Sequence, residues 1–564
     1  MTRRAATFLL GLTGLVLIAS SQAATPGQAA VASAHPLATQ AGHEILKKGG
    51  NAFDAAIAIT AAIGVVEPTG SGIGGGGFWL LHRARDNYQV MIDGREVAPL
   101  AATADMYLDK QGNARRRASL DGPLAAAIPG VPAALVHLAE KYGRLPLQIS
   151  LAPAIRYARQ GFAVTEHYRR MATLRQQALM KSDAAAEVFL NNGGVPALGH
   201  KIKQPDLAFT LRQIARHGRA GFYQGALAEK MVRGVKGAGG IWTLKDLQGY
   251  RVKERTPITG RYHGMRITSA APPSSGGIIL MQMLNILEGF KLDRYPSWQR
   301  KHLVIETMRQ AYRDRAQYLG DTDFVAVDIG RLTDKVYATR KRALINPNKA
   351  TPSQDLPGFK TNEGQDTTHF SVMDKDGNAV AATLSINYPF GSAFMPAGTG
   401  IILNNEMDDF VIKPGVPNVY GLVGGKANAI QPGKRPLSSM TPTFLETDDQ
   451  FIALGTPGGS RIITMVLLAT LEAAHGKGDI KDWVALPRYH HQYLPDRVVY
   501  ESAAFTDKEV EKLQNMGHIL KARKSTYGER SSYYGNMHAV VWDKRKNKVS
   551  AASDPRGEGE ARVR

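Results

Sequence analysis

The chain of 564 residues contains no cysteine, so it has no disulfide, no thiolate metal site and no cysteine nucleophile. Beyond residue 23 it also lacks an uninterrupted apolar run of about 18 residues, and no membrane-spanning helix is predicted there. The Gly-x-Ser-x-Gly motif of serine hydrolases and the His-Glu-x-x-His motif of zinc enzymes are missing. Adjacent His490 and His491 cannot face one metal from a helix, so we predict no metal site.

Acidic residues are fewer than basic ones: 49 Asp and Glu stand against 70 Lys and Arg, which gives a net charge of +21. The basic clusters are short and scattered, without interleaved aromatic residues: Arg115–Arg117, Arg340–Arg342 and Lys544–Lys546. A nucleic-acid surface needs a continuous basic patch or a recognisable module. We therefore interpret the clusters as solvated faces and expect no nucleic-acid partner.

The N-terminus has the pattern of an export signal. Arg3 and Arg4 precede an apolar stretch from Phe8 to Ile18, and Ser21 and Ala23 are small residues spaced as in a cleavage site. The alternative, a membrane anchor, would need a longer run of about 20 apolar residues. We predict that residues 1–23 are a cleaved signal peptide, which leaves an exported protein without a membrane span.

Periodicity after the signal peptide predicts a mixed α and β protein with a helix-rich N-terminal half. Helical spacing covers 37–48, 54–64 and most of 124–332, whereas 78–81, 368–373, 379–386 and 451–455 have the composition of strands. Glu67–Gly77 is the most glycine-dense stretch, and no Gly-Lys-Ser/Thr follows it, so we expect it to serve close backbone approach. Polar, aperiodic Pro347–Gln365 is the best candidate for a linker.

Thr367 lies where this linker meets a predicted β-hairpin. A two-residue turn at Asp376-Gly377 would set Thr367 opposite residue 386, give or take a residue or two, with Ser385 close and Thr383 on the same face as Ser385. A free N-terminal threonine carries its own base, because its α-amine has a pKa of about 7.7–8.0. We therefore expect self-cleavage between Asp366 and Thr367, which would give a large chain, 24–366, and a small chain, 367–564.

Nine segments resemble bacterial γ-glutamyltranspeptidases, also called glutathione hydrolases, and follow that family's order. They are Gly49–Ala56, Val65–Phe78, Asp93–Glu96, Pro272–Gly277, Asp366–Ser371, Asn404–Tyr420, Arg435–Met440, Gly455–Arg461 and Ser553–Arg556. The resemblance implies an α+β fold, the four-layer αββα sandwich of the N-terminal nucleophile hydrolases. It also implies that the large and small chains form one interlocked heterodimer.

The resemblance also assigns catalytic roles. Thr367 is expected as the nucleophile, with Ser385 and Thr383 beside it, and the N–H groups of Gly458 and Gly459 are expected as the oxyanion hole. Ser385 stands where the family has Thr or Ser.

The substrate's amino acid head is expected to be held by residues of both charges. Arg95, Ser438 and Ser439 would hold its α-carboxylate, and the resemblance assigns its α-ammonium to Asn387, Glu406 and Asp409. Glu406 stands where some bacterial members carry Gln. A lid over residues 413–425 would close with Tyr420 on the bound substrate.

The expected activity is γ-glutamyl transfer from glutathione and related amides to water or to an amino acid or peptide acceptor, without metal or organic cofactor. The bacterial resemblance favours the periplasm over full secretion. Two alternatives stay open. One is a β-lactam side-chain acylase, since cephalosporin acylases share the nucleophile and the sandwich. The other is a cationic surface-binding protein on an inactive enzyme scaffold.

Overall fold

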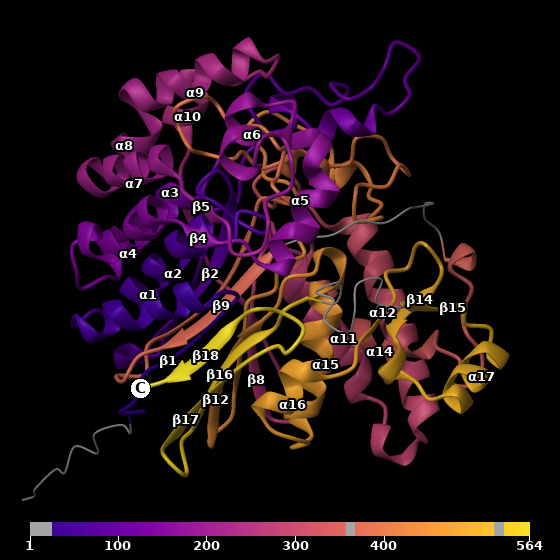
Figure 1. Ribbon diagram of the computed structural model, residues 1–564. Coiled ribbons are helices and arrows are strands. Elements are labelled where there is room, and N and C mark those ends of the chain that lie inside the picture. Colours follow the sequence, from indigo (N-terminus) through magenta and orange to yellow (C-terminus); the bar gives the residue numbers. More distant parts are fainter. Residues whose placement is uncertain (1–24, 357–366, 524–534) are drawn as a thin grey trace, which may run out of the picture.

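The computed structural model describes residues 25–356, 367–523 and 535–564. The predicted signal peptide, the cleavage residue Asp366 and positions 357–365 of the predicted linker lie outside the described residues. Two antiparallel sheets pack face to face between two sets of helices (Figure 1). The expected four-layer αββα sandwich is thus confirmed.

The first sheet has seven strands, in the order β18 (Glu560–Val563), β1 (Ala30–Ser33), β9 (Thr368–Met373), β10 (Ala379–Ser385), β2 (Gly76–Arg83), β3 (Tyr88–Asp93) and β6 (Lys253–Arg255). The second has six, in the order β17 (Lys548–Ser553), β16 (His538–Asp543), β12 (Gln450–Gly455), β11 (Thr443–Glu446), β8 (Met265–Ser269) and β7 (Ile258–Tyr262). Two small sheets are formed by β13 (Tyr489–His490), β14 (Val498–Glu501) and β15 (Leu520–Arg523), and by β4 (Phe162–Ala163) and β5 (Lys201–Ile202).

The helices before residue 250 cover the outer face of the seven-stranded sheet (Figure 1). They are α1 (Pro36–Lys47), α2 (Ala52–Val66), α3 (Val131–Lys141), α4 (Leu147–Gln160), α5 (Glu166–Leu179), α6 (Asp183–Phe189), α7 (Pro205–His217), α8 (Ala220–Tyr223), α9 (Gly225–Gly237) and α10 (Leu244–Gly249). The later helices pack against the six-stranded sheet. They are α11 (Gly276–Glu288), α12 (Ser297–Tyr318), α13 (Ile329–Leu332), α14 (Lys335–Ala343), α15 (Ile462–Ala474), α16 (Ile480–Ala485) and α17 (Asp507–Asn515).

Side chains of the seven-stranded sheet alternate between two hydrophobic clusters, as the two-residue period of a strand requires. Val31 and Val380 join the helices of the first cluster, whereas Ala30 and Ala381 join the second cluster, between the sheets. Both faces are therefore buried. This explains why the central strands have continuous apolar runs.

The hairpin of β9 and β10 differs from the prediction in its turn. The loop has three residues, Lys375–Gly377, and is closed by a hydrogen bond from Asp374 N to Asn378 O. Gly377 takes a positive φ of 90°, as the last residue of such a loop often does. Because the turn is one residue longer than predicted, β9 and β10 pair in a register that puts Thr368 opposite Leu384. One further step along this register sets Thr367 opposite Ser385.

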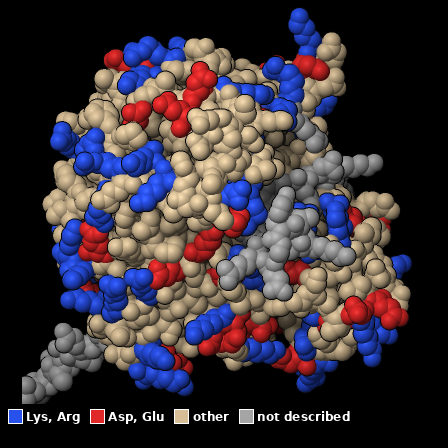
Figure 2. Space-filling view, in the orientation of Figure 1, with Lys and Arg blue, Asp and Glu red and all other residues tan. Residues whose placement is uncertain are grey.

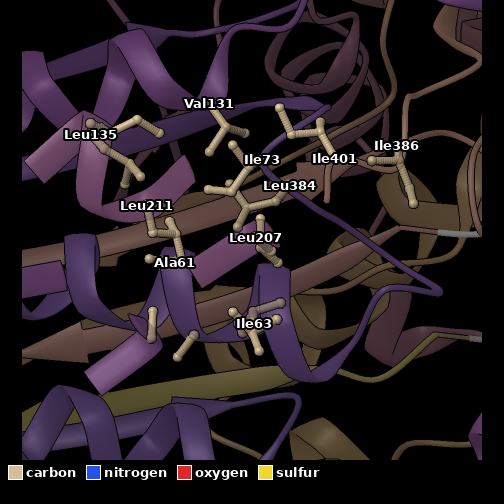
Figure 3. Packing of buried hydrophobic residues seen from close by; sticks show 14 of the residues in the cluster. Ala61, Ile63, Ile73, Val131, Leu135, Leu207, Leu211, Leu384, Ile386 and Ile401 are labelled. Atoms are coloured by element: carbon tan, nitrogen blue, oxygen red, sulfur yellow. The ribbon is translucent and has the colours of Figure 1, made fainter. Parts of the chain in front are cut away.

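The glycine-dense stretch runs against the end of β10, as expected. A Cβ on Gly75 would lie 2.2 Å from the carbonyl oxygen of Ser385, and one on Gly76 would lie 2.4 Å from Glu96 Oε2. Ile73 of the same stretch packs with Leu384 and Ile386 in the first cluster (Figure 3). Glycine is thus needed here for close approach.

The two sides of the expected cleavage point are interleaved in both large sheets. In the seven-stranded sheet, β9 and β10 follow Thr367 in sequence and lie between β1 and β2, which precede it. In the six-stranded sheet, β11 pairs with β8 across the same division. A cut at Thr367 would therefore leave both halves hydrogen-bonded to each other.

Each of the three basic clusters of the sequence contains at least one residue paired with a carboxylate. Lys341 pairs with Asp314 at 2.7 Å, and Arg545 pairs with Asp449 at 2.5 Å. Basic and acidic side chains are mixed over the face seen in Figure 2. Across the described parts of the chain, no helix combines the length and the apolar character needed to cross a membrane.

Gly75→Ala tests the close approach beside Ser385. We expect the apparent free energy of unfolding to fall by about 1–3 kcal/mol, because the new methyl group meets backbone that cannot move freely. Gly72→Ala is the matched control, since its Cβ would have its nearest contact at 3.7 Å, and it should stay within about 0.5 kcal/mol. Thermal denaturation of both variants measures the difference. Equal losses in the two variants would contradict the role given to Gly75.

Candidate active site

A small pocket opens at the start of β9. Nine of the predicted site residues line it: Arg95, Thr367, Ser385, Asn387, Asp409, Tyr420, Ser438, Ser439 and Gly459. Glu406 is fully buried and reaches the pocket through its contact with Arg95. Gly458 lines an adjoining pocket that also contains Thr367. Segments hundreds of residues apart in the sequence thus meet at one place.

Thr367 lies immediately before β9 and is 8% exposed. Its neighbour Thr368 donates a hydrogen bond of 2.7 Å from Oγ1 to Glu67 Oε2. This bond ties the start of the strand to the loop after α2. The position of Thr367 is therefore set by the sheet on one side and by the glycine-dense stretch on the other.

The two hydroxyls predicted beside Thr367 have different surroundings. Ser385 Oγ lies in the pocket and accepts a hydrogen bond of 2.8 Å from Asn387 N. Thr383 does not line the pocket, and its Oγ1 lies 2.9 Å from Nδ1 of buried His369. Burial holds the pKa of His369 well below its ordinary value, so this imidazole is neutral. Of the two hydroxyls, only that of Ser385 is in direct reach of the pocket.

Arg95 is the centre of the charged part of the pocket and is only 1% exposed. Its backbone N–H donates to Asp93 Oδ1 at 3.0 Å, and Tyr250 donates to its carbonyl at 2.8 Å. Its Nη1 pairs with Glu406 at 2.6 Å, and its Nη2 pairs with Asp409 at 2.5 Å. The guanidinium is therefore held by the same carboxylates that the sequence assigned to ammonium binding.

The carboxylates around Arg95 do not all carry full charge. Burial raises the pKa of Glu96 to about 7, against the opposing effect of Arg95 at 3.5 Å. Burial also raises the pKa of Glu406 well above its ordinary value, again opposed by Arg95. No motif in the sequence pointed to the shifted pKa of Glu96.

Three buried oxygen acceptors in this region have no hydrogen-bond partner among the described residues: Asn387 Oδ1, Glu406 Oε1 and Glu96 Oε1. Such groups are costly unless a ligand satisfies them. The backbone of Asn387 has a positive φ of 72°, and its Nδ2 donates to Asn405 O at 2.8 Å. With the amide nitrogen occupied, the oxygen remains for a donor. An ammonium group suits this set of acceptors.

The pocket lining also contains hydroxyl groups and a second arginine. Ser438 Oγ accepts from Met440 N at 3.1 Å, and Ser439 Oγ accepts from Nη2 of Arg315 at 3.1 Å. Both serines thus keep their own O–H protons for donation. Arg315 comes from α12 and was missed by sequence analysis, since it lies in a long charged helix without a recognisable motif.

The predicted lid covers the pocket through Tyr420, which is 3% exposed. Its hydroxyl donates to the carbonyl of Asn387. A Cβ on Gly459 would lie only 2.4 Å from the ring of Tyr420, so the ring packs directly against this glycine. Asp409 accepts from Asn418 Nδ2 at 3.1 Å, and Gly425 N donates to Ala316 O at 3.1 Å. The middle of the lid and its C-terminal end are thus tied to site elements.

Gly458 and Gly459 lie in the loop between β12 and α15, with positive φ values of 137° and 57°. Other residues rarely adopt such conformations. The carbonyl of the next residue, Ser460, accepts from Tyr312, and its hydroxyl donates to Gln492 at 2.6 Å. The contacts with Tyr312 and Gln492 therefore hold the loop in place, and its two glycines line the pockets beside Thr367.

One trio of metal-ligand side chains comes together among the described residues: His302, Glu306 and His518. His302 Nδ1 lies 2.8 Å from His518 Nε2, and burial lowers the pKa of both imidazoles. Arg309 Nε donates to Glu306 at 3.0 Å, which places a positive charge beside the trio. A hydrogen bond between neutral imidazoles accounts for this geometry. The trio shares no residue with the pocket.

The four-layer sandwich of two antiparallel sheets between helices is that of the class of N-terminal nucleophile hydrolases. A cephalosporin acylase structure from Bacillus halodurans matches 98% of this chain and 99% of its own, at 28% identity and a TM-score of 0.84. A γ-glutamyltranspeptidase chain from Helicobacter pylori is 42% identical, with a TM-score of 0.56. The match covers 58% of this chain and 94% of that one.

Within that class, residues 38–563 match the family model described as gamma-glutamyltranspeptidase. A curated relative from Pseudomonas sp. (strain A14), "Glutathione hydrolase proenzyme", is 43% identical over 531 residues. The match covers 93% of this chain and 92% of the relative. The chain belongs to the gamma-glutamyltranspeptidase family.

The raised pKa of Glu96 leads to a prediction for ligand binding. An ammonium group favours ionised carboxylates, so binding of L-glutamate should release protons and strengthen as pH rises through about 7. Calorimetry at about pH 6 and about pH 8 should show an affinity several-fold higher at the higher pH, within the limit of about tenfold per pH unit for one proton.

Glutarate is the matched control ligand, because it keeps both carboxylates and lacks the ammonium. Its affinity should not rise over the same range. Glu96→Gln should flatten the pH dependence for L-glutamate. An unchanged slope in that variant would show that another group titrates.

Proposed function

We propose that this protein is a self-cleaving γ-glutamyl hydrolase and transferase that acts on glutathione and other γ-glutamyl amides. The observation that carries the proposal is the charge arrangement beside Thr367. Arg95, two serine hydroxyls and the unpartnered Oδ1 of Asn387 share one small pocket with this residue, and Glu406 borders it through its contact with Arg95. This is a receptor for a free amino acid head, placed next to a hydroxyl nucleophile.

The pocket can accept a zwitterion without a large change in charge. Before binding, Arg95 contacts both Glu406, whose pKa is raised by burial, and Asp409. The ligand's α-carboxylate would pair with Arg95. Its α-ammonium would bind the carboxylates that Arg95 releases and Asn387 Oδ1. Each buried charge then exchanges one partner for another, which avoids leaving a charge unpaired.

Catalysis would use the hydroxyl and the α-amine of Thr367. Oγ1 attacks the γ-carbonyl carbon while the amine takes the hydroxyl proton, and the oxyanion is held by the N–H groups of Gly458 and Gly459. Collapse breaks the amide bond, and the leaving amine receives the proton from the Thr367 ammonium. Water or an acceptor amine then attacks the γ-glutamyl ester by the same steps in reverse, and Thr367 is restored.

The free amine would arise from self-cleavage at Asp366–Thr367. Oγ1 attacks the Asp366 carbonyl, the peptide bond becomes an ester, and water hydrolyses it to give two chains. The relative from Pseudomonas is named a proenzyme. The Helicobacter pylori chain covers about three fifths of this one, close to the share of 24–366. The interleaved sheets would hold the two chains together as a heterodimer.

The signal-like N-terminus supports export to the periplasm, with residues 1–23 removed. The acceptor would be water, an amino acid or a peptide. No metal or organic cofactor takes part in the proposed steps.

Acylase activity is the second candidate, and it is favoured by the likeness to the cephalosporin acylase over nearly the whole chain. A glutaryl side chain has no ammonium, so it would leave the acceptors of Asn387 and Glu406 unsatisfied. A higher kcat/KM for γ-glutamyl anilide than for glutaryl anilide supports the transferase. The reverse order supports the acylase.

Intact-mass spectrometry of variants at position 367 tests the proposal. Wild-type protein should give two chains, the smaller beginning at Thr367, and should hydrolyse γ-glutamyl-4-nitroanilide. Thr367→Ala should remain one chain and be inactive, whereas Thr367→Ser should keep part of both activities because it retains a hydroxyl and an α-amine.

Thr383→Ala is the comparison variant, because its hydroxyl contacts His369 outside the pocket. It should still be cleaved at Thr367. Two chains and full turnover in Thr367→Ala would refute the assigned nucleophile. An uncut wild-type chain would instead favour an inactive scaffold.

A further inference from the structure

Arg315 is a second arginine at the pocket wall, buried to 4% exposure. It lies near the C-terminal end of α12. Its Nε donates to Ser275 Oγ at 2.9 Å, and its Nη2 donates to Ser439 Oγ at 3.1 Å. Its third nitrogen, Nη1, makes no hydrogen bond to a described residue. The guanidinium thus links the segments that carry Ser275 and Ser439, and its Nη1 group remains available as a hydrogen-bond donor.

The charge of Arg315 is not balanced by an ion pair, unlike the charges of three other buried arginines. The structure pairs each of three others with a carboxylate: Arg95, Arg309 and Arg488. Arg315 forms no ion pair with any carboxylate of the described residues, and burial lowers its pKa from the ordinary value. An unpaired buried cation is unfavourable. The pocket is where an anion can reach it.

The bond to Ser439 also orients that hydroxyl. Because Ser439 Oγ accepts from a charged donor, its own proton is directed away from Arg315. Ser438 Oγ accepts from Met440 N and is restricted in the same way. Two O–H donors and the guanidinium groups of Arg95 and Arg315 therefore line the same pocket as the unpartnered Oδ1 of Asn387.

We propose that Arg315 is a positioning residue for the donor's α-carboxylate: it fixes Ser439 as a hydrogen-bond donor and supplies a second positive charge, besides that of Arg95, to the pocket lining. The inference rests on the proposed function and adds to it. Selectivity for donors that carry an α-carboxylate then depends on a residue outside the recognised motifs.

Three 4-nitroanilides separate this role from a structural one. The γ-glutamyl compound carries both charged groups, the glutaryl compound lacks the ammonium, and the 4-aminobutanoyl compound lacks the α-carboxylate. Arg315→Met should lower kcat/KM for the first two by roughly ten- to a hundred-fold, mainly through KM. Turnover of the 4-aminobutanoyl compound should be nearly unchanged. Equal losses on all three would overturn the proposal, and so would no loss on any.

Companion variants control for folding and for the route through Ser439. Arg315→Lys keeps the charge and should recover part of the loss. Arg309→Met removes a buried arginine from the same helix outside the pocket, so it should leave the ratios among the three substrates unchanged. In the double variant Arg315→Met/Ser439→Ala, kcat/KM for the γ-glutamyl compound should fall little further than in the more affected single variant. Fully additive losses would refute action through Ser439.

Calorimetry keeps this test separate from the test of the proposed function. Wild-type protein should bind L-glutamate more tightly than 4-aminobutanoate, and Arg315→Met should lose that preference. If wild-type protein binds L-glutamate but does not turn over the γ-glutamyl anilide, the proposed function fails while the binding comparison still decides the role of Arg315. If Arg315→Met prefers L-glutamate over 4-aminobutanoate as strongly as the wild-type protein does, the inference is overturned.

Discussion

The hydrogen-bond ladder that holds β9 between β1 and β10 is the constraint on which the site depends. It sets Thr368 opposite Leu384, and hence Thr367 opposite Ser385, at the end of a fully buried hairpin. A shift of one residue would turn every side chain of β9 to the other face. The glycine-dense stretch secures the same end of β10, because only glycine fits beside the Ser385 carbonyl.

The second organising feature is a set of buried charged groups that pair with each other in the protein and can pair with the charges of a ligand instead. Arg95 contacts Glu96, Glu406 and Asp409 in a region almost closed to water. Tyr420 covers them, and its lid is tied to Asp409 through Asn418. Closure of the lid and occupation of the charged pocket therefore involve the same residues.

Much of this could be predicted from local patterns and from the resemblance. The hairpin, Thr367 at its start, the close-approach role of the glycines and the helix-rich first half follow from residue types and short spacings. The length of the hairpin turn could not be predicted, because Asp374 closes a three-residue loop where Asp-Gly indicated two.

Properties that depend on tertiary contacts were not visible in the sequence. Arg315 has no motif and enters the site only because α12 packs behind Ser275 and Ser439. The raised pKa of Glu96 comes from burial, which no sequence spacing reveals. Thr383 shares a face with Ser385 but is engaged by His369, a partner that the period-2 pattern alone does not indicate.

The measurement that tests the central claim most directly is to trap the acyl-enzyme. The purified protein would be mixed with a γ-glutamyl donor, quenched in acid within the first turnover, digested and analysed by mass spectrometry. The account predicts one γ-glutamyl group on the hydroxyl of Thr367, in a peptide whose N-terminus is Thr367. A γ-glutamyl group on any other residue, or turnover with an intact Asp366–Thr367 bond, would contradict it.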